Sequence, residues 1–262
     1  MSATHALYSD DALQELQLVG LLTGLTDLDH LTHGLLPGAL WVIAATPGAG
    51  RTALACQLAR QVATTGGSAA LLSSRDERAE VLTNLLASQA RVPAQHVQRG
   101  DLNDGESKRL ASATARLAEV DLRLLTPADG VWAHSDGEGV ADFSSLMGSG
   151  RRVADLLVVD DLDLSLGTEW IHALPALRTW SRQRRFTLVV TVPAEGVAAV
   201  NPCHPDLRRH ADVVIRLGLP GQFDLEDARV GEADLDVLRN RHGPQARITV
   251  HFQGHYRRFA NA

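Results

Sequence analysis

A short glycine-containing segment between an apolar run and an amphipathic run is the strongest constraint in this 262-residue sequence. Its residues are Thr46, Pro47, Gly48, Ala49, Gly50, Arg51 and Thr52. It follows the apolar run 40–45 and precedes residues 52–64, where Leu54, Leu58 and Val62 recur at four-residue spacing. In a strand–loop–helix unit, glycines let the backbone approach a ligand closely, and the N–H groups that start the helix point at it. The segment therefore predicts a phosphate-binding loop, with Thr52 as a candidate Mg²⁺ ligand.

The rest of the chain alternates strand-like apolar runs with helical ones, which predicts an α/β fold with a mostly parallel sheet covered by helices. The expected strands are residues 40–45, 69–73, 122–125, 156–160, 187–192 and 212–217. The expected helices are residues 52–64, 76–90, 104–120 and 174–184, the last with Pro175 in its first turn. Alternation around His242-Gly243-Pro244 predicts a C-terminal β-hairpin from residues 235–239 and 247–252. Residues 126–150 and 193–206 are expected to be loops because they are rich in turn-forming residues.

Composition excludes several protein classes. The sequence has 45% hydrophobic and 21% charged residues, which is typical of a folded domain. It contains no apolar run long enough to span a membrane, and its amino terminus lacks a secretory pattern, so a cytoplasmic location is expected. The two cysteines stand far apart, which argues against a structural zinc site or a disulfide framework. The net charge of -6 gives no support for nucleic-acid binding.

Several further motifs occur in a fixed order along the chain. They are residues 23–29, 34–38, 85–91, 156–160, 206–208, 211–214, 238–244 and 252–259. Together with the phosphate loop they resemble the C-terminal ATPase domain of the DnaB-type replicative helicases, a RecA-like P-loop NTPase fold. The resemblance spans residues 23–260, and the family also tolerates alanine at the first glycine slot, here Ala45.

This resemblance implies a division of the chain into two parts. Residues 1–22 would be a linker-like helical segment, which in the family packs on an adjacent subunit, and residues 23–262 would be the ATPase domain. Only about 22 residues precede the match, so the family's N-terminal helical domain is expected to be missing. Ring assembly through the short helix would remain available, whereas primase docking through an N-terminal collar would not.

The resemblance also assigns roles to individual residues. ATP would bind at residues 46–52, and Mg²⁺ would be held by Thr52 and by Asp160, which matches the family's Walker B aspartate. Arg239 and Arg241 match a basic pair that reaches the nucleotide of the neighbouring subunit. Arg241 would be the arginine finger, which stabilises charge on the γ-phosphoryl group in a hexameric ring.

Three positions depart from the family pattern. Arg51 stands where the loop normally has lysine, although 24 of the 25 basic residues are arginine and base composition offers a second explanation. Arg75 occupies the slot of the glutamate that orients the attacking water, and a guanidinium cannot accept a proton. Asp76 or Glu77 would replace that glutamate if the local register slips by one or two residues.

The third departure concerns the segment after the strand 187–192. Pro193 takes the place of a polar sensor, usually glutamine, and has neither an amide side chain nor an N–H group. The loop 193–206, which in the family contacts single-stranded DNA, contains no lysine or arginine. Single-stranded DNA is therefore only weakly supported as a partner, because phosphate neutralisation supplies most non-specific affinity.

Two charged clusters allow more than one interpretation. Asp160, Asp161 and Asp163 form an acidic cluster, but alternation along a strand end would point Asp161 away from Asp160, which favours one Mg²⁺ ligand and solvated neighbours. Arg257 and Arg258 lie beside two aromatic residues, as in a nucleic-acid patch, whereas the resemblance places them at a structural end strand.

Two functions remain after these comparisons of residues. In the first, the chain is a DnaB-like ATP-binding domain of a helicase that translocates on single-stranded DNA, with impaired hydrolysis, in a homo-hexamer or a mixed ring with a related helicase. In the second, it is a catalytically degenerate RecA-fold protein that acts as a regulatory or scaffolding partner. The loss of the loop lysine, the glutamate and the sensor leaves open whether the chain is an enzyme.

Overall fold

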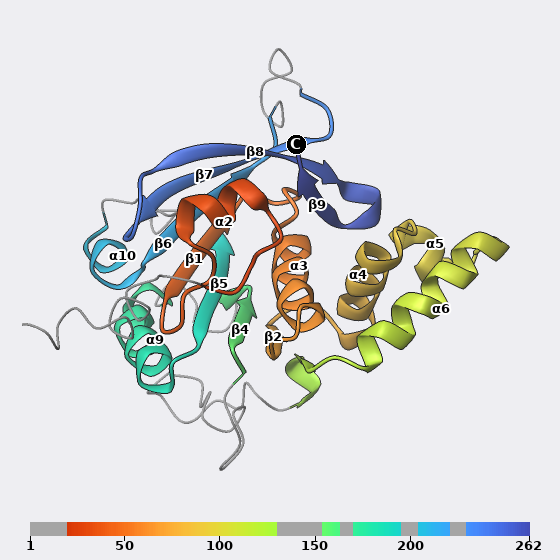
Figure 1. Ribbon diagram of the computed structural model, residues 1–262, viewed down its shortest axis with the longest axis horizontal. Helices are drawn as coiled ribbons and strands as arrows, with labels where there is room; N and C mark the ends of the chain where they lie inside the picture. The colour runs from red at the N-terminus through yellow and green to blue at the C-terminus, as the bar shows by residue number, and fades with distance from the viewer. Residues whose placement is uncertain (1–19, 130–153, 163–169, 195–203, 221–228) are drawn as a thin grey trace, which may run out of the picture.

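A computed structural model describes most of the chain (Figure 1). The described residues are 20–129, 154–162, 170–194, 204–220 and 229–262. The expected amino-terminal helix therefore lies outside the described residues, as do Asp163 and most of the two expected loops 126–150 and 193–206. Within the described part of the chain, no helix is both long enough and apolar enough to cross a membrane.

A nine-stranded sheet forms the centre of the molecule, in the order β3-β2-β4-β5-β1-β6-β7-β8-β9. The strands are β1 (Leu40–Ala45), β2 (Ala69–Ser73), β3 (Leu122–Leu125), β4 (Leu156–Asp160), β5 (Thr187–Pro193), β6 (Val213–Gly218), β7 (Glu232–Asn240), β8 (Ala246–Gln253) and β9 (Arg258–Asn261). The pairs from β3 to β6 are parallel, and those from β6 to β9 are antiparallel. The predicted mainly parallel α/β sheet and its C-terminal hairpin, here β7 and β8, are confirmed.

Helices cover both faces of the sheet. They are α2 (Thr26–Thr32), α3 (Arg51–Thr64), α4 (Arg78–Ala90), α5 (Ala94–Arg99), α6 (Asp104–Ala118), α9 (Trp170–Arg184) and α10 (Pro205–His210). Successive β1 side chains point to opposite faces, so Trp41 and Ile43 pack in the core under α2 and α3, while Leu40 and Val42 pack in the core under α9 and α10. Helices α4, α5 and α6 lie together on the outer side of α3 (Figure 1).

Helix α9 differs from its prediction at the amino-terminal end. It begins at Trp170, so Pro175 lies inside the helix and not in its first turn. Proline removes one intrahelical hydrogen bond at an interior position. The additional turn is stabilised by packing, because Trp170, Ile171 and Leu174 are all buried in the core on that face of the sheet.

The strand order creates a site at one edge of the sheet. Strand β1 lies between β5 and β6. The next strand along the chain, β2, is separated from β1 by two strands, β5 and β4. In open parallel sheets, ligands bind outside the carboxyl ends of the strands at such a change of direction. The loop after β1, Asp160 at the end of β4, and Pro193 at the end of β5 all belong to this edge.

Candidate nucleotide-binding site

The predicted phosphate loop connects β1 directly to α3. Gly48 and Gly50 adopt the left-handed backbone region with φ of 81° and 91°, and Gly50 immediately precedes the helix. The first N–H groups of a helix lack intrahelical partners, so the start of α3 offers backbone donors to an anion. Of the seven residues of the predicted phosphate loop, 46–52, only Ala49 is fully buried in the core. The other six line a cavity of about 580 Å³, a size typical of small-ligand sites.

Aromatic side chains from the C-terminal strands support the loop from behind. A Cβ atom at Gly50 would lie 2.7 Å from Cζ of Phe252 and 2.9 Å from Cζ of Phe259. The two rings stack with centroids 4.5 Å apart. The Phe259 amide also donates to Oε1 of Gln57 in α3, at 2.8 Å. The glycine is therefore required by packing as well as by backbone geometry.

Asp160 is fixed at the end of β4 by a neighbouring strand. It is buried, and its Oδ1 accepts a hydrogen bond from the Thr191 hydroxyl at 2.5 Å. Thr52 lines the cavity at the first turn of α3. A threonine hydroxyl and a carboxylate are ligands that Mg²⁺ accepts when waters and phosphate oxygens complete its shell. Asp160 itself is not among the residues that line the cavity, although its neighbour Asp161 is. The donor types fit a Mg²⁺–nucleotide, and Thr52 and Asp160 are the residues that would hold the metal.

The structure corrects the prediction for Asp161. The residue is not a solvated acid pointing away from the site: it is 2% exposed and forms an ion pair with Arg51 inside the cavity. Its φ of 59° lies in the left-handed region, which ends the alternation of β4 and turns the side chain towards the loop. Its backbone N–H donates to the Thr191 hydroxyl at 3.0 Å. The positive charge of the phosphate loop is therefore already bound to a carboxylate.

The loop after β2 brings Arg75, at the water-orienting position, and one of its two possible replacements, Asp76, into the cavity, whereas Glu77 is not among the residues that line it. Helix α4 begins at Arg78, so Arg75 and Asp76 belong to this loop, and both line the cavity. Burial raises the pKa of Asp76, and the nearby negative charge of Asp160 raises it further. Asp76 is thus a carboxylate close to the Walker B position, whereas Arg75 adds a cation to the same wall.

Three further polar or charged lining residues were not singled out as site residues by the sequence. Glu80 and Asn84 lie one turn apart on α4 and face the cavity, and Arg257 enters it from the end of the chain. The four-residue spacing of Glu80 and Asn84 could have indicated that both side chains lie on the same face of α4. For Arg257 no local signal existed, because its approach depends on β9 folding back beside α3.

Comparisons with known proteins agree with this architecture. A sequence profile described as "DnaB-like helicase C terminal domain" matches residues 20–130. The "Replicative DNA helicase DnaB" of Leifsonia xyli is 28% identical over 267 residues, covering 93% of this chain and 56% of that protein. The "Replicative DNA helicase DnaC" of Bacillus subtilis is 23% identical, with coverage of 93% and 57%. This chain is similar to the C-terminal domain of the DnaB-type replicative helicases. It spans about half the length of these curated relatives.

Solved structures show the same fold. One of them, described as an "ATPase Domain", matches with a TM-score of 0.79 at 18% identity, covering 99% of this chain and 97% of that one. Another, described as "The Structure Of A DnaB-Like Replicative Helicase And Its Interactions With Primase", matches with a TM-score of 0.76 at 19% identity, covering 97% and 67%. The predicted RecA-like fold is therefore confirmed.

The arginine pair expected to act between DnaB-type subunits lies at the opposite edge of the sheet. Arg239 is paired with Val214 in β6 and donates from Nε to the Ala211 carbonyl at 2.8 Å. Nε of Arg241 lies 3.3 Å from Oδ1 of Asp212, just before β6. These contacts are at the amino end of the parallel strands, about 16 Å from the phosphate loop along the five residue steps of β1. The resemblance assigned both arginines to the nucleotide of a neighbouring subunit, and within the chain neither of them lines the nucleotide cavity.

Proposed function

We propose that this chain is a nucleotide-binding domain of the DnaB type in which ATP hydrolysis is impaired. The observation that carries the proposal is the ion pair between Arg51 and Asp161. A loop cation normally neutralises the β- and γ-phosphates. Here a phosphate gains Arg51 as a partner only if Arg51 gives up a buried carboxylate, which reduces the net gain in binding free energy. The remaining loop donors still favour an anion, so binding is weakened and not abolished.

Two other positions support impaired hydrolysis. Arg75 lines the cavity at the slot of the water-orienting glutamate, and a guanidinium cannot act as a base near neutral pH. Pro193 lines the same cavity and has no amide to report on the γ-phosphate. ATP and Mg²⁺ would be held by the loop, Thr52 and Asp160. Asp76, next to Arg75 in the same wall of the cavity, is the carboxylate that would receive a proton, and it would supply any residual turnover.

A steady-state ATPase assay with single-stranded DNA tests this proposal. We expect turnover of the wild-type protein to be close to that of Asp160→Ala. We also expect the double change Arg51→Lys and Arg75→Glu to raise it, because these changes restore the loop ammonium and a carboxylate. DNA-stimulated turnover at ordinary helicase rates, abolished by Asp160→Ala, would contradict the proposal.

The second candidate is a regulatory or scaffolding partner that has lost its nucleotide. It is favoured by the same ion pair if Arg51 never leaves Asp161. Thermal unfolding with and without Mg²⁺–ATP separates the two candidates. A nucleotide-dependent rise in the unfolding temperature that is lost in Asp160→Ala supports a binding domain. No rise in the wild-type protein supports the scaffold.

Assembly is proposed from the relatives and from the position of Arg241. We infer that the chain joins a ring, either of its own copies or with a related helicase, in which Arg241 reaches the nucleotide of the next subunit. The support is geometric, because Arg241 lies at the sheet edge opposite its own loop. Single-stranded DNA remains a weakly supported ligand, since the loop 193–206 carries no cation.

A further inference from the structure

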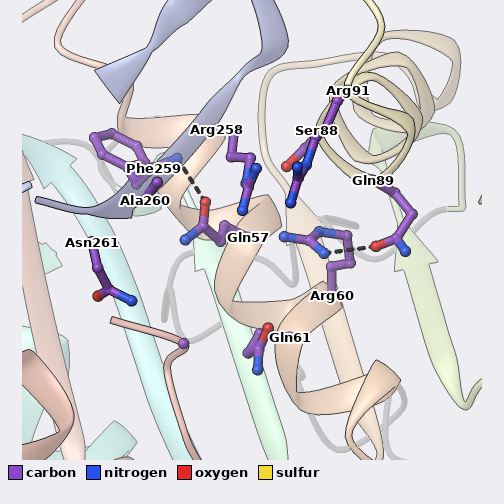
Figure 2. Close-up of a pocket in the computed structure, with 11 residues that line it drawn as sticks. Gln57, Arg60, Gln61, Ser88, Gln89, Arg91, Arg258, Phe259, Ala260 and Asn261 are labelled. Atoms are coloured by element: carbon purple, nitrogen blue, oxygen red, sulfur yellow. Dashed lines mark hydrogen bonds between the residues drawn. The ribbon is translucent and has the colours of Figure 1, made fainter. Parts of the chain in front are cut away.

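A second hollow lies along the middle of α3, between that helix, the end of α4 and β9 (Figure 2). Its volume is about 210 Å³. We call it the arginine hollow and define it by Arg60, Ser88, Arg91 and Arg258, with Gln57 and Gln89 beside them. It is separate from the nucleotide cavity. The adjacent residues Arg257 and Arg258 diverge, because Arg257 lines the nucleotide cavity and Arg258 lines the arginine hollow.

Three cations gather in the hollow, and no acidic residue is among the described residues that line it. Figure 2 shows the side chains of Arg60, Arg91 and Arg258 directed at the same space. Burial lowers the pKa of Arg60 to about 10, and the charge of Arg258 contributes to that shift. Burial and Arg91 likewise lower the pKa of Arg258. Among the described residues, no carboxylate forms an ion pair with any of these three arginines.

The uncharged side chains of the hollow also present donors. The Gln57 carbonyl oxygen accepts from the Phe259 amide at 2.8 Å, and the Gln89 carbonyl oxygen accepts from Nη1 of Arg60 at 2.7 Å. Both amides therefore keep their NH₂ groups for other partners. The Ser88 hydroxyl and Nε of Arg60 are buried and have no hydrogen-bond partner within the described part of the chain.

We propose that the arginine hollow binds a phosphate-class dianion, held by Arg60, Arg91 and Arg258 with the Ser88 hydroxyl as a further donor. Guanidinium groups pair well with tetrahedral phosphate oxygens, and buried charge-assisted hydrogen bonds are the strong ones. A lining that holds three guanidinium groups and no carboxylate among the described residues favours an anion over a cation or an apolar ligand. The dianion supplies a negative charge that the described residues do not place there. Its source is either free phosphate or the phosphomonoester group of a small metabolite.

Calorimetric titration with inorganic phosphate, at constant ionic strength set with chloride, tests the assignment. We expect millimolar phosphate to bind the wild-type protein and Arg258→Gln to weaken that binding about tenfold or more, since each charged hydrogen bond is worth about 1.5–3 kcal/mol. Arg123→Gln is the matched control, because Arg123 is exposed on β3 and pairs with Asp121. Arg51→Gln reports separately on phosphate bound at the loop. Equal phosphate affinity in wild type and Arg258→Gln would overturn the proposal.

The unfolding temperature of Arg258→Gln in chloride, without phosphate, shows whether this variant folds normally. Since Arg258 is repelled by its neighbours, we expect Arg258→Gln to unfold in chloride at the same temperature as the wild type or higher. A purely structural role predicts the reverse and would count against the site. Arg91→Asn is a second variant, because asparagine tolerates the φ of 52° at this helix end. It should also weaken phosphate binding.

Competition experiments distinguish the sources. A nucleoside monophosphate carries a dianionic phosphomonoester, and its displacement of phosphate through Arg258 supports a metabolite ligand. Its failure to compete supports free phosphate. Each phosphodiester of single-stranded DNA carries one negative charge, so an oligonucleotide is not expected to compete. Oligonucleotide competition that is lost in Arg258→Gln would overturn the assignment to a small dianion.

Discussion

Arg51 illustrates how one residue can have two competing partners. Its side chain is 18% exposed and lies beside both the α3 amino terminus and the Asp161 carboxylate. An ion pair that is partly removed from water is stronger than one on the surface, because solvent screens it less. A phosphate arriving at the loop must displace Asp161, or leave Arg51 where it is and bind through the backbone donors alone.

Removing the Asp161 charge should therefore strengthen nucleotide binding. We expect Asp161→Asn to bind Mg²⁺–ATP about tenfold more tightly, because Arg51 loses a charged hydrogen bond worth about 1.5–3 kcal/mol in the free protein. Asparagine tolerates the left-handed backbone at this position, so the turn is kept. Calorimetry with a slowly hydrolysed ATP analogue measures the change. Asp121→Asn, an exposed carboxylate on another loop, is the control, and an unchanged or weaker affinity of Asp161→Asn would be inconsistent with the competition.

Asp76 should make stability depend on pH. Burial and Asp160 raise the pKa of Asp76, so the native state binds its proton more tightly than the unfolded chain does. Stability is therefore lost as pH rises from the ordinary carboxyl pKa through the raised one. Asp76→Asn should be more stable than wild type near pH 7, and this advantage should disappear below about pH 4, where both states of the wild type are protonated. Urea unfolding at the two pH values measures the difference in free energy of unfolding between Asp76→Asn and wild type. An equal difference at both pH values would show that it does not come from the titration of Asp76.

At the scale of elements, the strands were the most predictable part. The first four strands have their predicted bounds because each is a continuous apolar or nearly apolar run that a buried parallel sheet requires. The short helices α2, α5 and α10 were not predicted. Helix α9 was predicted to start at residue 174, with Pro175 in its first turn. The helix starts earlier, at Trp170, because buried side chains before Pro175 stabilise an additional turn.

The candidate site was predictable only where it is local in sequence. Seven consecutive residues were enough to predict the phosphate loop, and the end of one apolar strand was enough to predict the role of Asp160. The partnership of Arg51 with Asp161 joins residues 110 positions apart and depends on a single left-handed residue, which alternation cannot reveal. The entry of Arg257 into the cavity depends on β9 pairing with β8. Such contacts follow from tertiary structure and not from local pattern.

The support of the loop by β8 and β9 gives a matched pair of glycine substitutions. Gly50 and Gly66 have similar φ values of 91° and 98°, but a Cβ at Gly66 meets nothing within 4 Å, whereas one at Gly50 clashes with Phe252. Both alanine variants carry the left-handed strain of about 1–3 kcal/mol. Gly50→Ala should lose about 1–3 kcal/mol more from overpacking. Urea unfolding checks this difference, and equal losses would show that the rings move aside freely.

Across the whole molecule, the two edges of the parallel sheet have different chemistry. The carboxyl edge holds the nucleotide cavity, and the amino edge holds Asp212, which is buried and accepts hydrogen bonds from Arg178 at 2.5 and 2.8 Å. Asp212 also accepts from the Leu40 amide at 3.0 Å. Arg241 is the second basic residue that contacts this carboxylate, and its side chain is about one-third exposed. Arg178 therefore suffices to hold Asp212, and Arg241 remains accessible to a neighbouring molecule.

This arrangement predicts a separation between binding and assembly. Arg241→Gln should leave the fold and the nucleotide affinity of the isolated chain unchanged, because Arg178 still pairs with Asp212 and the loop lies at the other edge. It should reduce any assembly that Mg²⁺–ATP promotes, since the neighbour's phosphate loses its cation. Sedimentation velocity with and without nucleotide measures assembly, and Arg216→Gln, an exposed arginine paired with Asp236, is the control. A loss of nucleotide affinity in dilute Arg241→Gln would mean that this arginine acts within its own chain, which the distance along β1 opposes. Unchanged assembly would remove it from the subunit interface.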